Sequence, residues 1–392
     1  MKKYRELIIF IICYVAYTSI YVTRINLSMA SPALVDGGIL DSAQIGMMGS
    51  AFSVVYAFGR IISGNIGDKQ PPWIMISAGL LVAGISNVLA GLFPPFIAMM
   101  ILWMANAFAQ SMLWGSVLKI MSAIYDEKKV KKAASYMVTS VATGNIVAIL
   151  GTTFVIERMG LAFAFIIPGC LTLVMSTVVV LSLRKIKAVP EQKEHKSFLH
   201  LLKDKKIKQL LMPAVFHGVM KDNVSLWMTV YFVQKFGVNL EESALFVLFI
   251  PVIGLIGRLL YNPCYKLCGG NENRVSVMAF AVCIASAIPL TMGLVTPIIA
   301  TVALSLIYAA VSLINTSMLT FFPIRFLESN NVSSVSGIMD FATYFGAGIG
   351  SFAYGFIIKS AGYAPMFGSW IAISILSIIL MYSLLKKDKK SA

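Results

Sequence analysis

Apolar residues occupy most of the chain in long runs, which are broken by short charged clusters and by pairs of Pro or Gly residues. A run of about 20 mostly apolar residues is long enough to cross a bilayer as a helix. Backbone groups in hydrocarbon must find their partners within the segment, so each run is predicted to be helical. The pattern predicts twelve spans, at 7–30, 44–64, 73–92, 96–118, 134–154, 162–183, 210–233, 243–263, 275–294, 297–320, 334–357 and 364–385.

The composition supports an all-α membrane protein with these twelve transmembrane helices. Hydrophobic residues make up 58% of the 392 positions and charged residues only 12%, whereas a soluble domain carries about a quarter charged residues. The first span follows Lys2, Lys3 and Arg5 and could be mistaken for a signal peptide. Because it continues to Arg24 and many spans follow, we expect it to be retained.

The basic residues predict the topology. Of the 32 Lys and Arg residues, 25 fall on the side of the two termini, four fall inside spans, and three (Arg158, Lys235 and Lys359) fall on the other side. Basic residues accumulate in cytoplasmic loops, so both termini are predicted to be cytoplasmic in a plasma or inner membrane. The net charge of +15 is then explained by loops and does not indicate nucleic-acid binding.

A polar segment divides the chain into two halves of six spans each. This basic segment, 184–208, separates an N-terminal half, 1–183, from a C-terminal half, 209–392. It is predicted to be a cytoplasmic linker, in which His195 and His200 are solvated.

The two halves share a short repeated pattern. Arg24-Ile25-Asn26-Leu27-Ser28 and Lys221-Asp222-Asn223-Val224-Ser225 follow one pattern, basic-x-Asn-aliphatic-Ser, at an offset of 197 residues, and Gly59-Arg60 recurs as Gly257-Arg258 at an offset of 198. Parallel six-helix repeats are the architecture of major facilitator transporters. The resemblance implies two pseudo-symmetric halves with a substrate site near the membrane midplane.

Four cations inside spans are the first candidates for that site: Arg24, Arg60, Lys221 and Arg258. A charge at the centre of a span costs roughly 2.5–3.5 kcal/mol, so such residues are usually functional. The alternatives are snorkelling to the interface and pairing with an acid, which apply more to Arg60 and Arg258 than to Arg24. Lys221 precedes Asp222, but adjacent helical positions point about 100° apart, so no pairing is required.

Aromatic and imidazole side chains share helical faces with three of these cations. Tyr17 and Tyr21 lie on the face of Arg24, Tyr56 precedes Arg60 by four residues, and His217 precedes Lys221 by four. A single aromatic residue would be expected in the lipid belt. Rings grouped around a buried cation are more typical of a pocket wall.

A site with two Arg and one Lys favours an anion, because guanidinium binds phosphate or carboxylate in a bidentate manner. The acids inside spans are Asp222 and Asp340, each a candidate counter-ion or coupling group. If the four in-span cations and these two acids all face the cavity, the net charge is 4 − 2 = +2, and an organic phosphate, roughly a dianion at neutral pH, would balance it. Asp340 lies in a Gly-rich span that permits close helix approach, with Gly337, Gly346, Gly348 and Gly350.

Four motifs resemble the organophosphate:phosphate antiporters, the glycerol-phosphate and hexose-phosphate carriers of the major facilitator superfamily. They are Tyr17-x3-Tyr21-x2-Arg24-x-Asn26, Tyr56-x3-Arg60-x3-Gly64-x3-Asp68, Gln110-x3-Trp114-x4-Lys119 and Lys221-x5-Trp227. The resemblance implies that Arg24 and Lys221 bind the anionic group from the two halves and that Arg60 assists. It also implies that Tyr17, Tyr21, Tyr56 and Trp114 line the cavity.

The sequence departs from this family at three points. The best-known members carry Arg where this chain has Lys221 and a His in span five, where this chain offers only Asn145. Gln70-Pro71-Pro72 replaces the usual basic continuation of the loop after span two. Phosphate as the counter-substrate is therefore not implied, and related anion:cation symporters that move sugar acids share the Arg-x-Asn motif.

The sequence therefore predicts a secondary active transporter of a small organic anion, most plausibly a phosphorylated metabolite, which works as a monomer by exchange or symport. Two alternatives remain open: a proton- or sodium-coupled symporter of sugar acids or other carboxylates, and a membrane receptor for a phosphorylated ligand. An exporter of hydrophobic cations would need acids in the cavity. No catalytic motif, cofactor or metal site is predicted, because Cys264 and Cys268 have no His partner.

Overall fold

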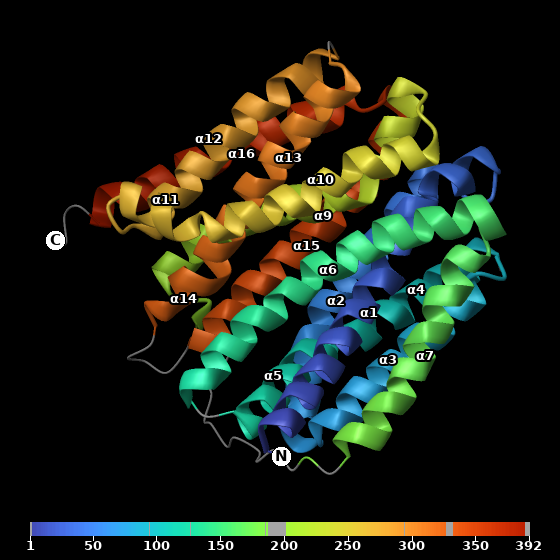
Figure 1. Ribbon diagram of the computed structural model, residues 1–392. Helices are drawn as coiled ribbons and strands as arrows, with labels where there is room; N and C mark the ends of the chain where they lie inside the picture. Colours follow the sequence, from blue (N-terminus) through green and yellow to red (C-terminus); the bar gives the residue numbers. More distant parts are fainter. Residues whose placement is uncertain are drawn as a thin grey trace. The chain divides into compact units, whose positions relative to one another are not determined.

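A computed structural model describes residues 2–93, 95–125, 127–184, 186, 201–293, 295–326 and 332–388, and these residues are nearly all helical (Figure 1). The chain divides into two compact units, residues 1–44 with 51–192, and residues 45–50 with 193–392. Most of the predicted linker, including His195 and His200, lies outside the described residues.

The first unit contains the six spans predicted for the first half except residues 45–50 of the second span, and it is coloured from blue to light green in Figure 1. Its helices are α1 (Lys2–Asp36), α2 (Ser42–Lys69), α3 (Pro72–Ala90), α4 (Phe96–Ser111), α5 (Leu113–Ile124), α6 (Glu127–Met159) and α7 (Phe163–Leu183).

The second unit contains the remaining spans. Its helices are α9 (Lys205–Phe236), α10 (Leu240–Leu259), α11 (Tyr261–Leu267), α12 (Glu272–Met292), α13 (Pro297–Thr316), the π-helix η1 (Ser317–Phe321), α14 (Phe322–Ile324), α15 (Val332–Ala361) and α16 (Ala364–Asp388).

Each predicted span coincides with helix, which confirms the predicted fold class. Within the described residues, 11 helical segments are long and apolar enough to cross a membrane. The remaining span, 210–233, lies in α9, which has 32 residues but carries His217, Lys221 and Asp222 near its middle.

Two predicted spans are interrupted, 96–118 at Met112 and 243–263 at Leu260, between α10 and α11. Residues 96–118 form α4 and part of α5, which meet at Met112, whose N–H bonds to the Ala109 carbonyl three residues back at 3.2 Å. The Ser111 hydroxyl also bonds within this turn, to the Phe108 carbonyl at 2.6 Å. Such local bonds compete with the regular helical ladder and interrupt it.

The repeat seen in the basic residues extends to local structure. Capping boxes begin both α2, at Asp41 and Gln44, and α10, at Asn239 and Glu242. These pairs are 198 residues apart. The loops before them each contain a glycine with φ of +66°, Gly38 and Gly237, a conformation that residues with a side chain rarely adopt.

The helices also pack in the same order in each unit. In the first unit α1 packs against α6 and α7, and α3 against α4 and α7. In the second unit α9 packs against α15 and α16, and α12 against α13 and α16. Gly59 faces Ser111 and Gly257 faces Ala309, again at the same 198-residue offset.

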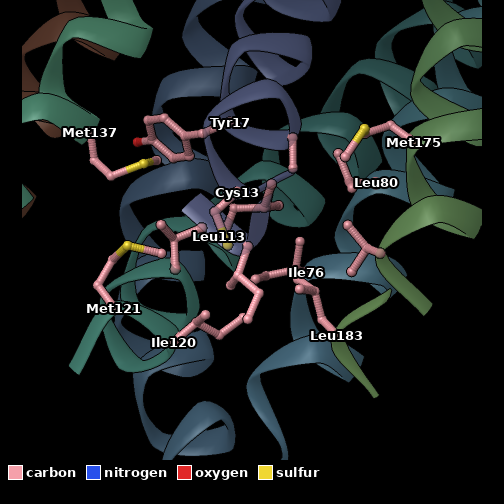
Figure 2. Close-up of a cluster of buried hydrophobic side chains, with 14 of the residues drawn as sticks. Cys13, Tyr17, Ile76, Leu80, Leu113, Ile120, Met121, Met137, Met175 and Leu183 are labelled. Atoms are coloured by element: carbon pink, nitrogen blue, oxygen red, sulfur yellow. The ribbon is translucent and has the colours of Figure 1, made fainter. Parts of the chain in front are cut away.

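An apolar cluster joins five helices of the first unit and fixes one side of α1. Figure 2 shows Cys13 and Tyr17 of α1 among side chains of α3, α5, α6 and α7. The hydrophobic effect contributes little to the association of helices in lipid. The unit is therefore stabilised by the close packing of these side chains. The cluster thereby holds the helix that carries Arg24, two turns beyond Tyr17. Its labelled members are Cys13, Tyr17, Ile76, Leu80, Leu113, Ile120, Met121, Met137, Met175 and Leu183.

Candidate functional site

Arg24 is half-buried and lies over two aromatic rings of α2. Its Cζ is 4.7 Å from the centroid of the Phe52 ring and 5.6 Å from that of Tyr56. The two rings are stacked, with centroids 6.1 Å apart and planes inclined by 11°. Cation–π contacts of this kind contribute about 0.5–2 kcal/mol, depending on how dry the site is. Tyr56, which the sequence associates with Arg60, therefore contacts Arg24.

Three other predicted cavity residues come together in a second aromatic group. The Tyr17 ring centroid is 5.7 Å from that of Tyr21 and 5.0 Å from that of Trp114. Tyr17 is only 5% exposed and belongs to the apolar cluster of Figure 2, whereas Tyr21 and Trp114 are half-buried. Tyr17 is thus a packed support for the two more accessible rings.

The other candidates in the first unit occupy different environments. Arg60 is half-buried in the second half of α2. Lys119, part of the Trp114 motif, donates to the Gly67 carbonyl at 2.7 Å and so holds the end of α2, where a cation is favoured by the helix dipole. Asn145 is buried in α6, and its Oδ1 has no hydrogen-bond partner among the described residues. It remains a candidate acceptor.

Lys221 has both a carboxylate and an aromatic partner. Its Nζ lies 3.5 Å from Asp222 Oδ1, and the two side chains are 18% and 17% exposed. The same Nζ lies 4.6 Å from the centroid of the Tyr344 ring in α15. Helical spacing left this pairing open, and it forms because the long lysine side chain can bend back to the adjacent residue.

Close packing of α9 on α15 brings Tyr344 to Lys221. Gly218 faces the Thr343 carbonyl, and Gly346 faces the Val215 carbonyl, with no room for a Cβ atom at either glycine. Small residues allow such an approach between membrane helices. The close approach predicted from the glycines of this span is present at Gly346, while a Cβ atom added at Gly337 would meet no atom of another described segment within 4 Å.

The remaining candidate residues of the second unit are His217, Asp340 and Arg258. His217 is fully buried, with Nε2 3.1 Å from the Val311 carbonyl of α13 and no partner for Nδ1 in the part of the chain described. Asp340 is half-buried, one turn before Tyr344 on α15. Arg258 lies in the last turn of α10, where the helix dipole favours a cation, so its position has a structural explanation.

The two principal cations therefore differ electrostatically. Arg24 lies on aromatic rings, whereas Lys221 is balanced by Asp222. The Asp222 carboxylate, 3.5 Å from the Lys221 ammonium, offsets its positive charge and repels an anion that binds it. The ion pair with Asp222 lowers the free-energy cost of placing Lys221 in the membrane. It also weakens the affinity of Lys221 for an anion.

Sequence reasoning missed two ring partners and a set of buried amides. Phe52 could have been found because it precedes Tyr56 by one turn, and Tyr344 because it follows Asp340 by one turn. Asn87 and Asn106 are polar residues in apolar spans, and nothing in their local pattern connects them with Arg24.

Comparisons with known proteins identify the group to which these features belong. The family model described as Major Facilitator Superfamily matches residues 13–351. A probable hexose phosphate transport protein of Chlamydia trachomatis is 23% identical over 290 residues, which cover 66% of this chain and 64% of that protein, so the match spans under two thirds of the relative. The phosphoglycerate transporter protein of Salmonella typhimurium is 22% identical over 386 residues, 89% of this chain and 82% of its own.

A sensor and a solved transporter are also similar. The membrane sensor protein UhpC of Escherichia coli is 31% identical over 103 residues, 26% of this chain and 23% of its own. The crystal structure of a variant of the nucleoside transporter NupG matches with a TM-score of 0.79 at 14% identity, covering 97% of this chain and 99% of that one. The named relatives confirm the resemblance to the organophosphate:phosphate antiporters. The chain belongs to the major facilitator superfamily.

Proposed function

We propose that this protein is a secondary active transporter of a small phosphorylated organic anion. The observation that carries the proposal is the Arg24 guanidinium on the Phe52 and Tyr56 rings, inside an apolar span. A guanidinium that lies on a ring directs its N–H donors outward in its own plane, the geometry that suits a phosphate. The names of the relatives, a hexose phosphate transport protein and a phosphoglycerate transporter, support the same class of substrate.

Lys221 is the second ligand in this proposal. Arg24 and Lys221 would both bind the anionic group, Arg60 would add positive potential, and Trp114 and Tyr21 would contact the rest of the molecule. The bodies that move in alternating access would be the halves 1–183 and 209–392, joined by a cytoplasmic linker. Binding of the anion would favour the closed form because it interacts most strongly there, and this differential binding gives exchange.

Reconstituted protein provides the test. Proteoliposomes are loaded with inorganic phosphate or an organic phosphate, and uptake of radiolabelled glucose 6-phosphate, glycerol 3-phosphate, 3-phosphoglycerate and gluconate is measured. We expect uptake of at least one phosphate ester and its loss in Arg24→Ala and Lys221→Ala. Arg158→Ala, in the last turn of α6 and outside the candidate site, is the matched control and should transport normally.

Two results would count against the proposal. Near-normal uptake by Arg24→Ala or Lys221→Ala would remove that residue from the site. Uptake of gluconate alone would favour the carboxylate symporter, with Asp222 or Asp340 as coupling groups. Lys221→Arg should keep partial uptake of a phosphate ester, because guanidinium also binds phosphate.

A sensor of a phosphorylated ligand is the second candidate, because one relative is named as a membrane sensor. A sensor would bind glucose 6-phosphate in a thermal-shift assay without carrying it across the membrane. Binding with no uptake in any loading condition would favour this function.

A further inference from the structure

Buried amide side chains surround the backbone carbonyl that directly precedes Arg24. Asn87 Nδ2 donates to the Thr23 carbonyl at 3.2 Å, and Asn106 Nδ2 donates to it at 2.9 Å. These amides belong to α3 and α4, so two other helices hold one point of α1. We call the set Thr23, Asn26, Asn87, Asn106 and Gln110 the amide cluster.

The other groups of the amide cluster are also paired. Gln110 Nε2 donates to Asn106 Oδ1 at 2.9 Å. Asn26 Nδ2 lies 2.8 Å from Asn87 Oδ1 and 3.1 Å from the Ala164 carbonyl of α7. The five side chains are completely or almost completely buried.

Such a network fixes the rotation and the height of α1 more strictly than apolar packing does. Apolar side chains can slide past one another at little cost. An amide that loses its partner in a dry interior is left unsatisfied, which is expensive. The network therefore selects one position of α1 relative to α3, α4 and α7.

The fixed point is the peptide group between Thr23 and Arg24. Its orientation determines the direction in which the Arg24 side chain leaves the helix. That side chain must place its guanidinium 4.7 Å from the Phe52 ring centroid on α2. A small rotation of α1 would move the end of this long side chain off the rings.

We propose that Asn87 and Asn106 are positioning residues, which orient Arg24 for the anionic group of the substrate. The proposal rests on the proposed function of Arg24. In this proposal neither amide touches the substrate, because both are buried and donate to backbone carbonyls: Asn106 to Thr23 of α1, and Asn87 to Thr23 and to Ala83 of its own helix.

Leucine substitutions test the proposal, since leucine resembles asparagine in size but has no polar atom. Asn87→Leu and Asn106→Leu should each raise the half-saturation concentration for glucose 6-phosphate exchange about ten-fold, while the maximal rate changes less. The control is Ser176→Ala, which removes a buried hydrogen bond of 2.8 Å to the Ser77 carbonyl between α7 and α3 of the same unit. It should lower thermal stability without changing half-saturation.

A second background separates positioning from general damage. In Arg24→Lys the flexible ammonium needs less orientation than a guanidinium. In the Arg24→Lys background, Asn106→Leu should therefore raise the half-saturation concentration only about two-fold. A full ten-fold loss in both backgrounds would overturn the proposal.

A measurement without substrate distinguishes this proposal from the proposed function. The five native cysteines are replaced by serine, Arg24→Cys is introduced, and its labelling rate by a small thiol reagent is compared with and without Asn106→Leu. We expect the rate to change by about three-fold or more, because the side chain leaves α1 in a new direction. An unchanged rate would overturn the positioning role even if transport is confirmed. A changed rate in a protein that carries no phosphate ester would support the positioning role and refute the proposed function alone.

Discussion

Replacement of Asp222 by asparagine should strengthen anion binding. Asparagine has the shape of aspartate but no charge, so Asp222→Asn leaves Lys221 without its carboxylate partner at 3.5 Å. The anion would then meet an ammonium group that no longer has to be shared.

The magnitude follows from the geometry. Two unit charges 3.5 Å apart attract by roughly 5 kcal/mol at an effective dielectric constant of about 20. Most of this is offset by the desolvation of the two ions, although the side chains are only 18% and 17% exposed and are therefore weakly screened. If about 1.4 kcal/mol of the attraction remains, the affinity for the anion should rise about ten-fold.

Tighter binding should also slow turnover. The change stabilises the bound ground state but not the transition state for conversion between the two open forms. It therefore lowers the half-saturation concentration without raising the maximal rate. The change adds one positive charge to the site, so the preference for dianionic over monoanionic substrates should rise as well.

The assay combines binding and exchange. Thermal shift against glucose 6-phosphate gives the affinity, and exchange in proteoliposomes gives half-saturation and maximal rate at two pH values that change the charge of the phosphate. Asp222→Glu, which retains the carboxylate, should resemble the wild type. Weaker binding by Asp222→Asn would refute the view that the carboxylate competes with the anion.

Three further predictions concern α15. Tyr344→Leu removes the ring 4.6 Å from Lys221 Nζ and should change the half-saturation concentration about three- to ten-fold, the range of a cation–π contact. Tyr344→Phe keeps the ring and should stay close to wild type. Equal effects of the two substitutions in exchange assays would contradict this. Gly346→Ala places a Cβ against the Val215 carbonyl and should reduce the yield of monodisperse protein in size-exclusion chromatography, whereas Gly337→Ala, with open space around it, should not. Asp340→Asn should leave phosphate-ester exchange intact if the carrier is not proton-driven, and loss of exchange would indicate that Asp340 couples transport to protons.

The sequence predicts the fold well because span length and charge are local properties. Twelve apolar runs can be found without knowledge of their neighbours, and basic residues repeated at 197 and 198 positions indicate two related halves. The α4–α5 break is not predicted, because Met112 lies in an apolar run without Pro or Gly beside it.

Sequence reasoning proposes the candidate residues, but it does not predict most of the side chains that contact them. Helical spacing groups Tyr17, Tyr21 and Arg24, which share one helix. It cannot predict that Arg24 lies on Phe52 of α2, since this depends on how each helix rotates in the packed unit. The same limit applies to Tyr344, which reaches Lys221 through the close approach of two helices.

The angular argument for Lys221 and Asp222 leaves their pairing undecided for a different reason. It follows the directions in which the side chains leave the helix and neglects the four methylene groups of lysine. Those groups let the ammonium return to the carboxylate of the next residue.

The interruption at Met112 divides one membrane span into two helical segments, α4 and α5. Asn106, which helps to hold the peptide group before Arg24, lies on α4, and Trp114, whose ring packs on Tyr17, lies on α5. A helix bends at lower cost at such an interruption than along an unbroken hydrogen-bonded stretch. A bend at Met112 would therefore move Trp114 relative to Asn106 and to the Thr23 carbonyl that Asn106 holds.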